Sequence, residues 1–332
     1  MARILDIDHP ATGAGHLFIP GSADSIVAAA RIAATAPWPV WVTVGREHRL
    51  PMLLERPVTE GAVEIWCLGY SGTGNALVSP ALEAHVTHRP VRWFSTTTGR
   101  LKLLASELAG VKLESLPGGS LVNLVQRDRK GRWTPDDHVA ERLGYMFGRY
   151  PGWRATPREL KLANQLHAAS VAVRNHEGQG PHLIRALAET PLADWASVEK
   201  LAELAESGEE TIRQGRSALL ETAPAHGSPS GGPALWSMPM GVIKRGVHGK
   251  AIAAACWRRK SPVALVEETE RGFTKAWVVL PARRENLWVP VAECFGGFTS
   301  DFSWTGRRGA GAIHSSDLHK FLPKLWSVIR RR

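Results

Sequence analysis

The chain has 332 residues, of which 44% are hydrophobic and 22% charged, a balance that excludes a disordered or fibrous protein. At roughly 100–200 residues per domain, its length favours two domains that each bury a core. No apolar run approaches the ~18 residues that span a membrane, and the acidic start lacks the apolar segment of a signal peptide. The cysteines Cys67, Cys256 and Cys294 form no CxxC pair, so we expect a cytoplasmic protein without disulfides.

The first part of the chain alternates short apolar runs with helical patterns. A helix rich in small residues is predicted at 24–33, and strands are predicted at 16–20, 39–44, 63–68 and 90–94. Strands that alternate with helices imply βαβ units. We therefore expect an α/β domain with a mostly parallel sheet at residues 1–135.

A helical period follows, and we interpret residues 136–222 as a helical connector. The predicted helices cover residues 136–147, 157–174, 181–187, 194–205 and 209–220, with Asp136 and Ser207 as N-caps. Residues 223–233 hold three Pro, three Gly and two Ser, a composition that predicts a linker.

The charge of the chain changes at this predicted linker. Residues 1–233 hold 24 Lys and Arg against 24 Asp and Glu, whereas residues 234–332 hold 17 against 7, so the whole net charge of +10 lies in the latter. A one-sided field of this kind attracts polyanions such as nucleic acid or a phosphorylated nucleotide. Solubility, or docking of an acidic protein, would use the same basic surface, and the sequence leaves these alternatives open.

Residues 234–332 carry the pattern of a second, smaller α/β domain. The predicted elements are a helix at 250–257, strands at 262–266 and 275–280, a helix or turn at 288–294 and a last helix at 316–329. A glycine-rich segment at 295–313 precedes the last helix.

Polar residues follow three of the strands predicted in the first domain. The segment 21–30 begins as a polar turn with Ser22 and Asp24 and continues into the small-residue helix. Cys67 ends a strand, and residues 95–97 follow the aromatic strand. In order and position these segments resemble the metal-binding motifs of the DHH/DHHA1 phosphoesterases. The resemblance implies an α/β domain that binds two metals, a helical connector, and a smaller C-terminal domain with a glycine-rich substrate loop.

The residue types at these positions depart from the family pattern. Of the aspartates and histidines expected there, Asp24 alone is in place. The other positions that should line the cleft hold Cys67, Ser95, Thr96 and Thr97. Hydroxyl groups are weak ligands for divalent metals, so a two-metal centre is not assembled from this set. We expect a vestigial cleft and no cofactor.

An alternative metal site is present in the sequence. Asp6, Asp8 and His9 together with Asp24 could hold Mn²⁺ or Mg²⁺, because Asp6 and Asp8 would face the same side of a strand. This arrangement would make the protein an active phosphodiesterase or nuclease with a relocated site. An ordinary acidic surface explains the same residues.

The segment 305–312 resembles the substrate loop of the family, with arginine in place of histidine. Arg307 and Arg308 suit bidentate phosphate contacts, and Gly306, Gly309 and Gly311 would let the backbone approach a ligand. The nearby aromatic residues Phe298, Phe302 and Trp304 would stack on a base or pack the loop onto its own sheet. The sequence thus predicts a catalytically degenerate protein that binds nucleic acid or a phosphorylated nucleotide between its domains, alone or as a subunit of a larger assembly. The alternatives are the active enzyme and a protein-docking subunit with a basic face.

Overall fold

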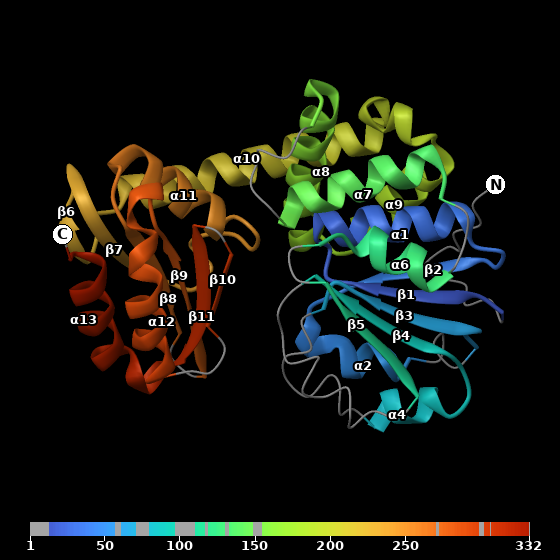
Figure 1. Cartoon of the computed structure of the whole chain (residues 1–332), viewed down its shortest axis with the longest axis horizontal. Coiled ribbons are helices and arrows are strands. Elements are labelled where there is room, and N and C mark those ends of the chain that lie inside the picture. The colour runs from blue at the N-terminus through green and yellow to red at the C-terminus, as the bar shows by residue number, and fades with distance from the viewer. Residues whose placement is uncertain are drawn as a thin grey trace. The chain divides into compact units, whose positions relative to one another are not determined.

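The computed structural model divides the chain into two compact units, Met1–Gly208 and Glu209–Arg332 (Figure 1). Unit 1 and unit 2 each contain one β-sheet covered by helices. None of the described helices has the length and apolarity to cross a bilayer. The structure describes residues 13–56, 61–70, 80–96, 110–116, 119–129, 133–148, 155–269, 272–298, 302–305 and 307–331.

The sheet of unit 1 has five strands in the order β2-β1-β3-β4-β5, and every neighbouring pair is parallel, as the sequence predicts. The strands are β1 (Gly15–Ile19), β2 (Val40–Val44), β3 (Glu64–Leu68), β4 (Val91–Ser95) and β5 (Val111–Ser115). The sequence prediction missed β5. This edge strand is half exposed and carries Lys112 and Glu114, so it lacks the apolar run that marks the central strands.

Helices cover both faces of this sheet, which explains the continuous apolar character of its strands. Leu17 and Ile19 of β1 face the larger core under α1, and Phe18 faces the smaller core under α2 and α4 (Figure 1). The helices of the larger layer are α1 (Ala23–Thr35), α6 (Leu121–Arg129), α7 (Pro135–Gly148), α8 (Pro157–Asn175) and α9 (Gln179–Glu189). Those of the other layer are α2 (Leu50–Leu54) and α4 (Pro80–Val86), and 3-10 helices lie at η1 (Glu47–Arg49) and η3 (Leu192–Ser197).

Two predicted helix starts are wrong. Thr134, not Asp136, caps α7: its hydroxyl accepts the Asp137 N–H at 3.2 Å, and the Asp137 carboxylate accepts the Thr134 N–H at 2.9 Å. Ser207 lies inside α10 (Glu199–Glu221), which runs through the predicted break. Gly208 also lies inside α10. A Cβ at this position would lie 1.9 Å from the Ala168 carbonyl oxygen, so the glycine lets α10 pack closely on α8.

The sheet of unit 2 has six strands in the order β10-β11-β9-β8-β7-β6, of which β7 and β8 are parallel. The crossover helix α11 (His248–Arg259) joins these two strands and covers one face, while α12 (Trp288–Gly296) and α13 (Leu318–Ile329) cover the other. The strands are β6 (His226–Ser228), β7 (Gly231–Pro239), β8 (Val263–Glu268), β9 (Phe273–Val279), β10 (Ser303–Thr305) and β11 (Arg308–His314); 3-10 helices lie at η4 (Ala282–Leu287) and η5 (Ser315–Asp317).

The segment 223–233, predicted to be a linker, forms β6 and the first residues of β7. The guanidinium of Arg259 holds the turn between them, donating hydrogen bonds to the carbonyls of Gly232 (2.8 Å), Gly231 (2.8 Å), Pro229 (3.1 Å) and Ser228. Proline, glycine and serine therefore mark a tight hairpin here, because turns and linkers share that composition. The boundary between the units lies earlier, inside α10.

Candidate functional site

The carboxyl ends of β1, β3 and β4 lie next to one another at one edge of the parallel sheet. The strand order reverses at β1, because β2 lies on one side of it and β3 to β5 lie on the other, and α/β sheets commonly bind ligands at such a reversal. Ser22 and Asp24 follow β1, Ser95 ends β4, and Thr96 follows it. We call these four residues the sheet-edge cluster. Asp6, Asp8, His9 and Thr97 lie outside the described residues, so the relocated metal site stays a prediction.

Asp24 is a structural cap. It is 7% exposed, and its two carboxylate oxygens accept the Leu121 N–H at 3.1 and 3.3 Å, which satisfies the start of α6. A Cβ on Gly144 of α7 would lie 2.6 Å from its Oδ1, so α7 closes over the carboxylate. Burial raises the pKa of Asp24 to about 7, against the opposing effect of hydrogen bonds from Leu121 and Thr96.

The other residues of this edge also serve the fold. Ser22 caps α1, since its hydroxyl accepts the Ser25 N–H at 3.3 Å. Cys67 is fully buried among Phe18, Ile65 and Trp93, and burial raises the pKa of its thiol. Cys67 therefore belongs to the core and does not line a cleft. Ser95 is buried as well.

The described residues of this edge do not fit a divalent metal. Their one carboxylate already accepts a backbone N–H, their hydroxyls are weak neutral ligands, and the Cys67 thiol stays protonated. Within the described part of the chain, no three histidine, cysteine, aspartate or glutamate side chains come together as a metal site.

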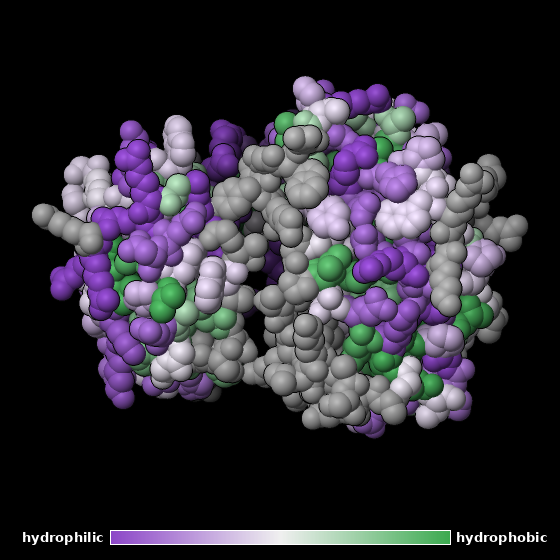
Figure 2. All heavy atoms as spheres, in the orientation of Figure 1, coloured by the Kyte–Doolittle hydropathy of each residue, from purple (hydrophilic) through white to green (hydrophobic). Residues whose placement is uncertain are grey.

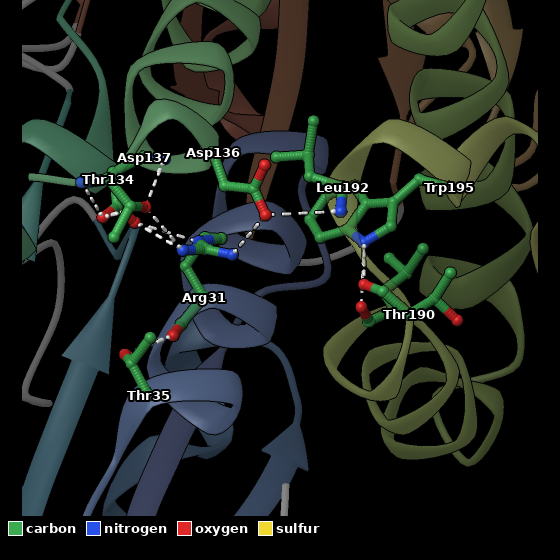
Figure 3. Close-up of polar contacts among 9 residues, drawn as sticks. Arg31, Thr35, Thr134, Asp136, Asp137, Thr190, Leu192 and Trp195 are labelled. Carbon is green, nitrogen blue, oxygen red and sulfur yellow. Dashed lines mark hydrogen bonds and ion pairs between the residues drawn. The ribbon is translucent and has the colours of Figure 1, made fainter. Parts of the chain in front are cut away.

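A second polar group of unit 1 lies further along α1, where Arg31 meets the start of α7 (Figure 3). The Arg31 guanidinium donates to Asp137 Oδ1 through Nε at 3.0 Å and Nη2 at 2.8 Å, and pairs with Asp136 at 3.5 Å. Burial raises the pKa of Asp137, but hydrogen bonds from Thr134 and Arg31 outweigh it and hold the pKa below its usual range. Asp136 also accepts the Leu192 N–H at 3.5 Å. The network therefore joins α1, α7 and η3.

The predicted substrate loop of unit 2 is a β-hairpin. Arg307 occupies the turn between β10 and β11, and Arg308 begins β11 opposite Val279 of β9. A Cβ on Gly309 would lie 2.7 Å from the Phe302 ring, and one on Gly311 2.6 Å from the Phe295 ring. These two glycines make room for the protein's own aromatic rings rather than for a ligand. Gly306 lies outside the described residues.

The aromatic residues of the hairpin form a stacked series that runs from the core to the surface. Phe302 stacks on Phe295 at 4.2 Å between ring centroids and on Trp304 at 5.8 Å, and Trp304 stacks on Trp288 at 6.0 Å. Phe302 therefore packs onto its own unit, as does Phe298, which meets Phe321 edge-on at 5.5 Å. Trp304 is 46% exposed and keeps surface available for a stacked base.

The positive charges near the hairpin belong to two groups. Arg307 pairs with Glu285 at 3.8 Å in an exposed and therefore weak ion pair. Burial, together with the charges of Arg216 and Arg308, lowers the pKa of Lys250 to about 8. The sequence did not indicate Arg216 and Lys250, because they lie on helices far from Arg308 along the chain and their charges act on one another only in the folded unit. The visible face of unit 2 is predominantly hydrophilic, with scattered apolar residues (Figure 2).

The two units together have the fold of the DHH/DHHA1 phosphoesterases, as the sequence predicts. RecJ from Thermus thermophilus in complex with Mn²⁺ aligns with a TM-score of 0.62 and 16% identity over 97% of this chain and 53% of RecJ. This chain thus spans about half of that protein. The pGpG-specific phosphodiesterase PggH from Vibrio cholerae aligns at 0.51 and 10% identity over 95% of this chain and 98% of PggH. A manganese-bound exonuclease RecJ aligns at 0.50 and 14% identity, over 97% and 91%. No protein-family model and no curated protein matches the sequence.

Proposed function

We propose that this chain binds nucleic acid or a phosphorylated nucleotide through unit 2 and does not hydrolyse it by a two-metal mechanism. The observation that carries the proposal is the placement of the whole net charge of +10 in residues 234–332, in the unit that also exposes Trp304 beside Arg307. A basic surface attracts the phosphates, and an exposed indole stacks on a base of any sequence.

The similar structures support the same class of ligand, because one is an exonuclease and another a phosphodiesterase specific for pGpG. The chemistry of the sheet-edge cluster supports binding without hydrolysis, since Asp24 caps α6 and its neighbours carry hydroxyls. We propose that the protein acts in the cytoplasm, without a metal cofactor, either alone or as a subunit of a larger assembly.

The test uses the full chain with short labelled DNA and RNA oligonucleotides and manganese, scoring the bound and cleaved fractions in the same tubes. We expect binding that weakens steeply as salt rises, without cleavage. Cleavage that Asp24→Asn abolishes would overturn the proposal and make the remaining carboxylates catalytic. A chain that neither binds nor cleaves would contradict it as well and favour an acidic protein partner.

A further inference from the structure

Three cations of unit 2 come from three separate elements, and the charges of two of them, Arg216 on α10 and Arg308 on β11, act on the third, Lys250 on α11. We call them the basic cluster. A Cβ on Gly215 would lie 2.6 Å from Val247 Cγ1, so α10 passes against the residue that precedes α11, and Arg216 is the next residue along α10. Lys250 lies in the first turn of α11.

The register of β11 places Arg308 on the same side. Gly309 faces Phe302 and Trp288, on the side of α12, and successive residues of a strand point to opposite faces. Arg308 therefore points to the side of α11, together with Ala310 and Ala312, which are half-buried. On this side β11 also carries the exposed His314 at its far end, so Ala310 and Ala312 are the residues of this strand that lie next to Arg308.

The charges within the cluster oppose one another. Lys250 is half-buried, and the positive charges of Arg216 and Arg308 disfavour its charged form. The carboxylate of Glu209 favours that form, but its effect is smaller. Such an arrangement costs free energy in the unoccupied protein, and perturbed cations of this kind gather where an anion is bound. Trp277 of β9 pairs with Ala310 of β11 and stacks parallel to His248 at 4.2 Å, so the first turn of α11 lies over the strand next to β11.

We propose that Arg216, Lys250 and Arg308 form a binding site for a phosphate group. This inference deepens the proposed function and rests on it: it assigns the phosphate contact to a site on the α11 side of the sheet. Two guanidinium groups supply planar pairs of donors, and the ammonium supplies a compact point charge. Arg307 is not part of this site, because it lies in the turn that precedes β11, 3.8 Å from Glu285.

The test measures binding of inorganic pyrophosphate to the full chain by isothermal titration calorimetry. Lys250→Gln should weaken binding by about tenfold or more, because a hydrogen bond to a charged group contributes about 1.5–3 kcal/mol. Lys320→Gln, which removes the same charge from an exposed position of α13, should change binding by less than about twofold. Lys250→Arg should restore most of the affinity. Equal effects of Lys250→Gln and Lys320→Gln would overturn the site.

Thermal melting separates a lost site from a lost fold. Lys250→Gln should not lower the melting temperature, because it removes a half-buried charge from beside two others. Arg308→Gln provides a second variant with the same expected loss of pyrophosphate binding. If the chain binds oligonucleotides and both variants bind pyrophosphate as the wild type does, the site is wrong and the proposed function stands. If the chain binds no oligonucleotide or nucleotide, but binds pyrophosphate and loses it in Lys250→Gln, the proposed function fails and the site stands.

Discussion

Two buried polar groups of unit 1 and the basic cluster of unit 2 are arranged in opposite ways. In unit 1, Asp24 meets a backbone N–H and Arg31 meets two aspartates, so these buried groups are satisfied by the protein itself. In unit 2, the charges of Arg216 and Arg308 oppose that of the half-buried Lys250. Groups satisfied internally stabilise a fold, whereas like charges held together favour an external anion. Removing the Asp137 partner of Arg31 should therefore reduce stability in unit 1, whereas removing a cation of the basic cluster should reduce binding in unit 2.

The buried ion pair of unit 1 provides the largest expected effect on stability. Asp137→Ala leaves the Arg31 guanidinium, 9% exposed, without its main partner and should cost about 3–5 kcal/mol of unfolding free energy. Glu203→Ala breaks an exposed pair with Lys200 and should cost less than about 1 kcal/mol. Urea unfolding measures both variants. Similar losses would remove the distinction between a closed buried network and an ordinary surface pair.

The protonation of Asp24 gives a pH-dependent test of the sheet-edge cluster. Its pKa is raised to about 7 by burial, above the usual value of 3.8, so the wild type is stabilised below pH 4 and loses that stability as the pH rises through 7. Asp24→Asn keeps an oxygen for the Leu121 N–H without the ionisable proton. The unfolding free energy of this variant minus that of the wild type should therefore increase by about 3 kcal/mol from pH 5 to pH 8.

Urea unfolding at the two pH values measures this gain. A difference in stability that does not change with pH would mean that Asp24 ionises in the folded protein as easily as it does in water. The carboxylate would then again be a candidate ligand for a divalent metal.

The smallest expected effect concerns stacking in unit 2. Trp304→Ala should weaken binding of a short oligonucleotide by about 1–2 kcal/mol, because it removes a half-exposed ring on which a base can stack. Trp257→Ala, on α11 and 84% exposed, is the matched control and should leave binding unchanged. Fluorescence anisotropy measures both. If Trp257→Ala weakens binding more, the base stacks on the last turn of α11 rather than on the hairpin.

The sequence predicted those parts of the fold that carry a strong local pattern. β1 to β4 are rich in apolar residues, such as Leu17 and Trp93, and the helix of small residues at α1 has a clear period. The edge strand β5 was missed because charged side chains interrupt it. The hairpin of β6 and β7 was missed because only the distant Arg259 distinguishes its turn from a linker.

The sequence predicted the positions of the candidate site residues better than it predicted their roles. Asp24 stands where the motif places it, but its partner Leu121 lies 97 residues away, and no local pattern reports such a contact. Gly309 and Gly311 were interpreted as openings for a ligand because the rings that fill them come from other segments. Lys250 gained its significance only from the packing of α10, α11 and β11.

The contacts around the start of β7 determine where a fragment that contains unit 2 alone should begin. The Trp236 indole donates to the Thr222 carbonyl at 2.9 Å, Gly215 packs against Val247, and Arg259 grips the turn before β7. A fragment that starts at residue 234, where the composition changes, would lose all three contacts and expose the flank of β7. A fragment that starts at Glu209 keeps them, so expression of the basic unit on its own should begin there.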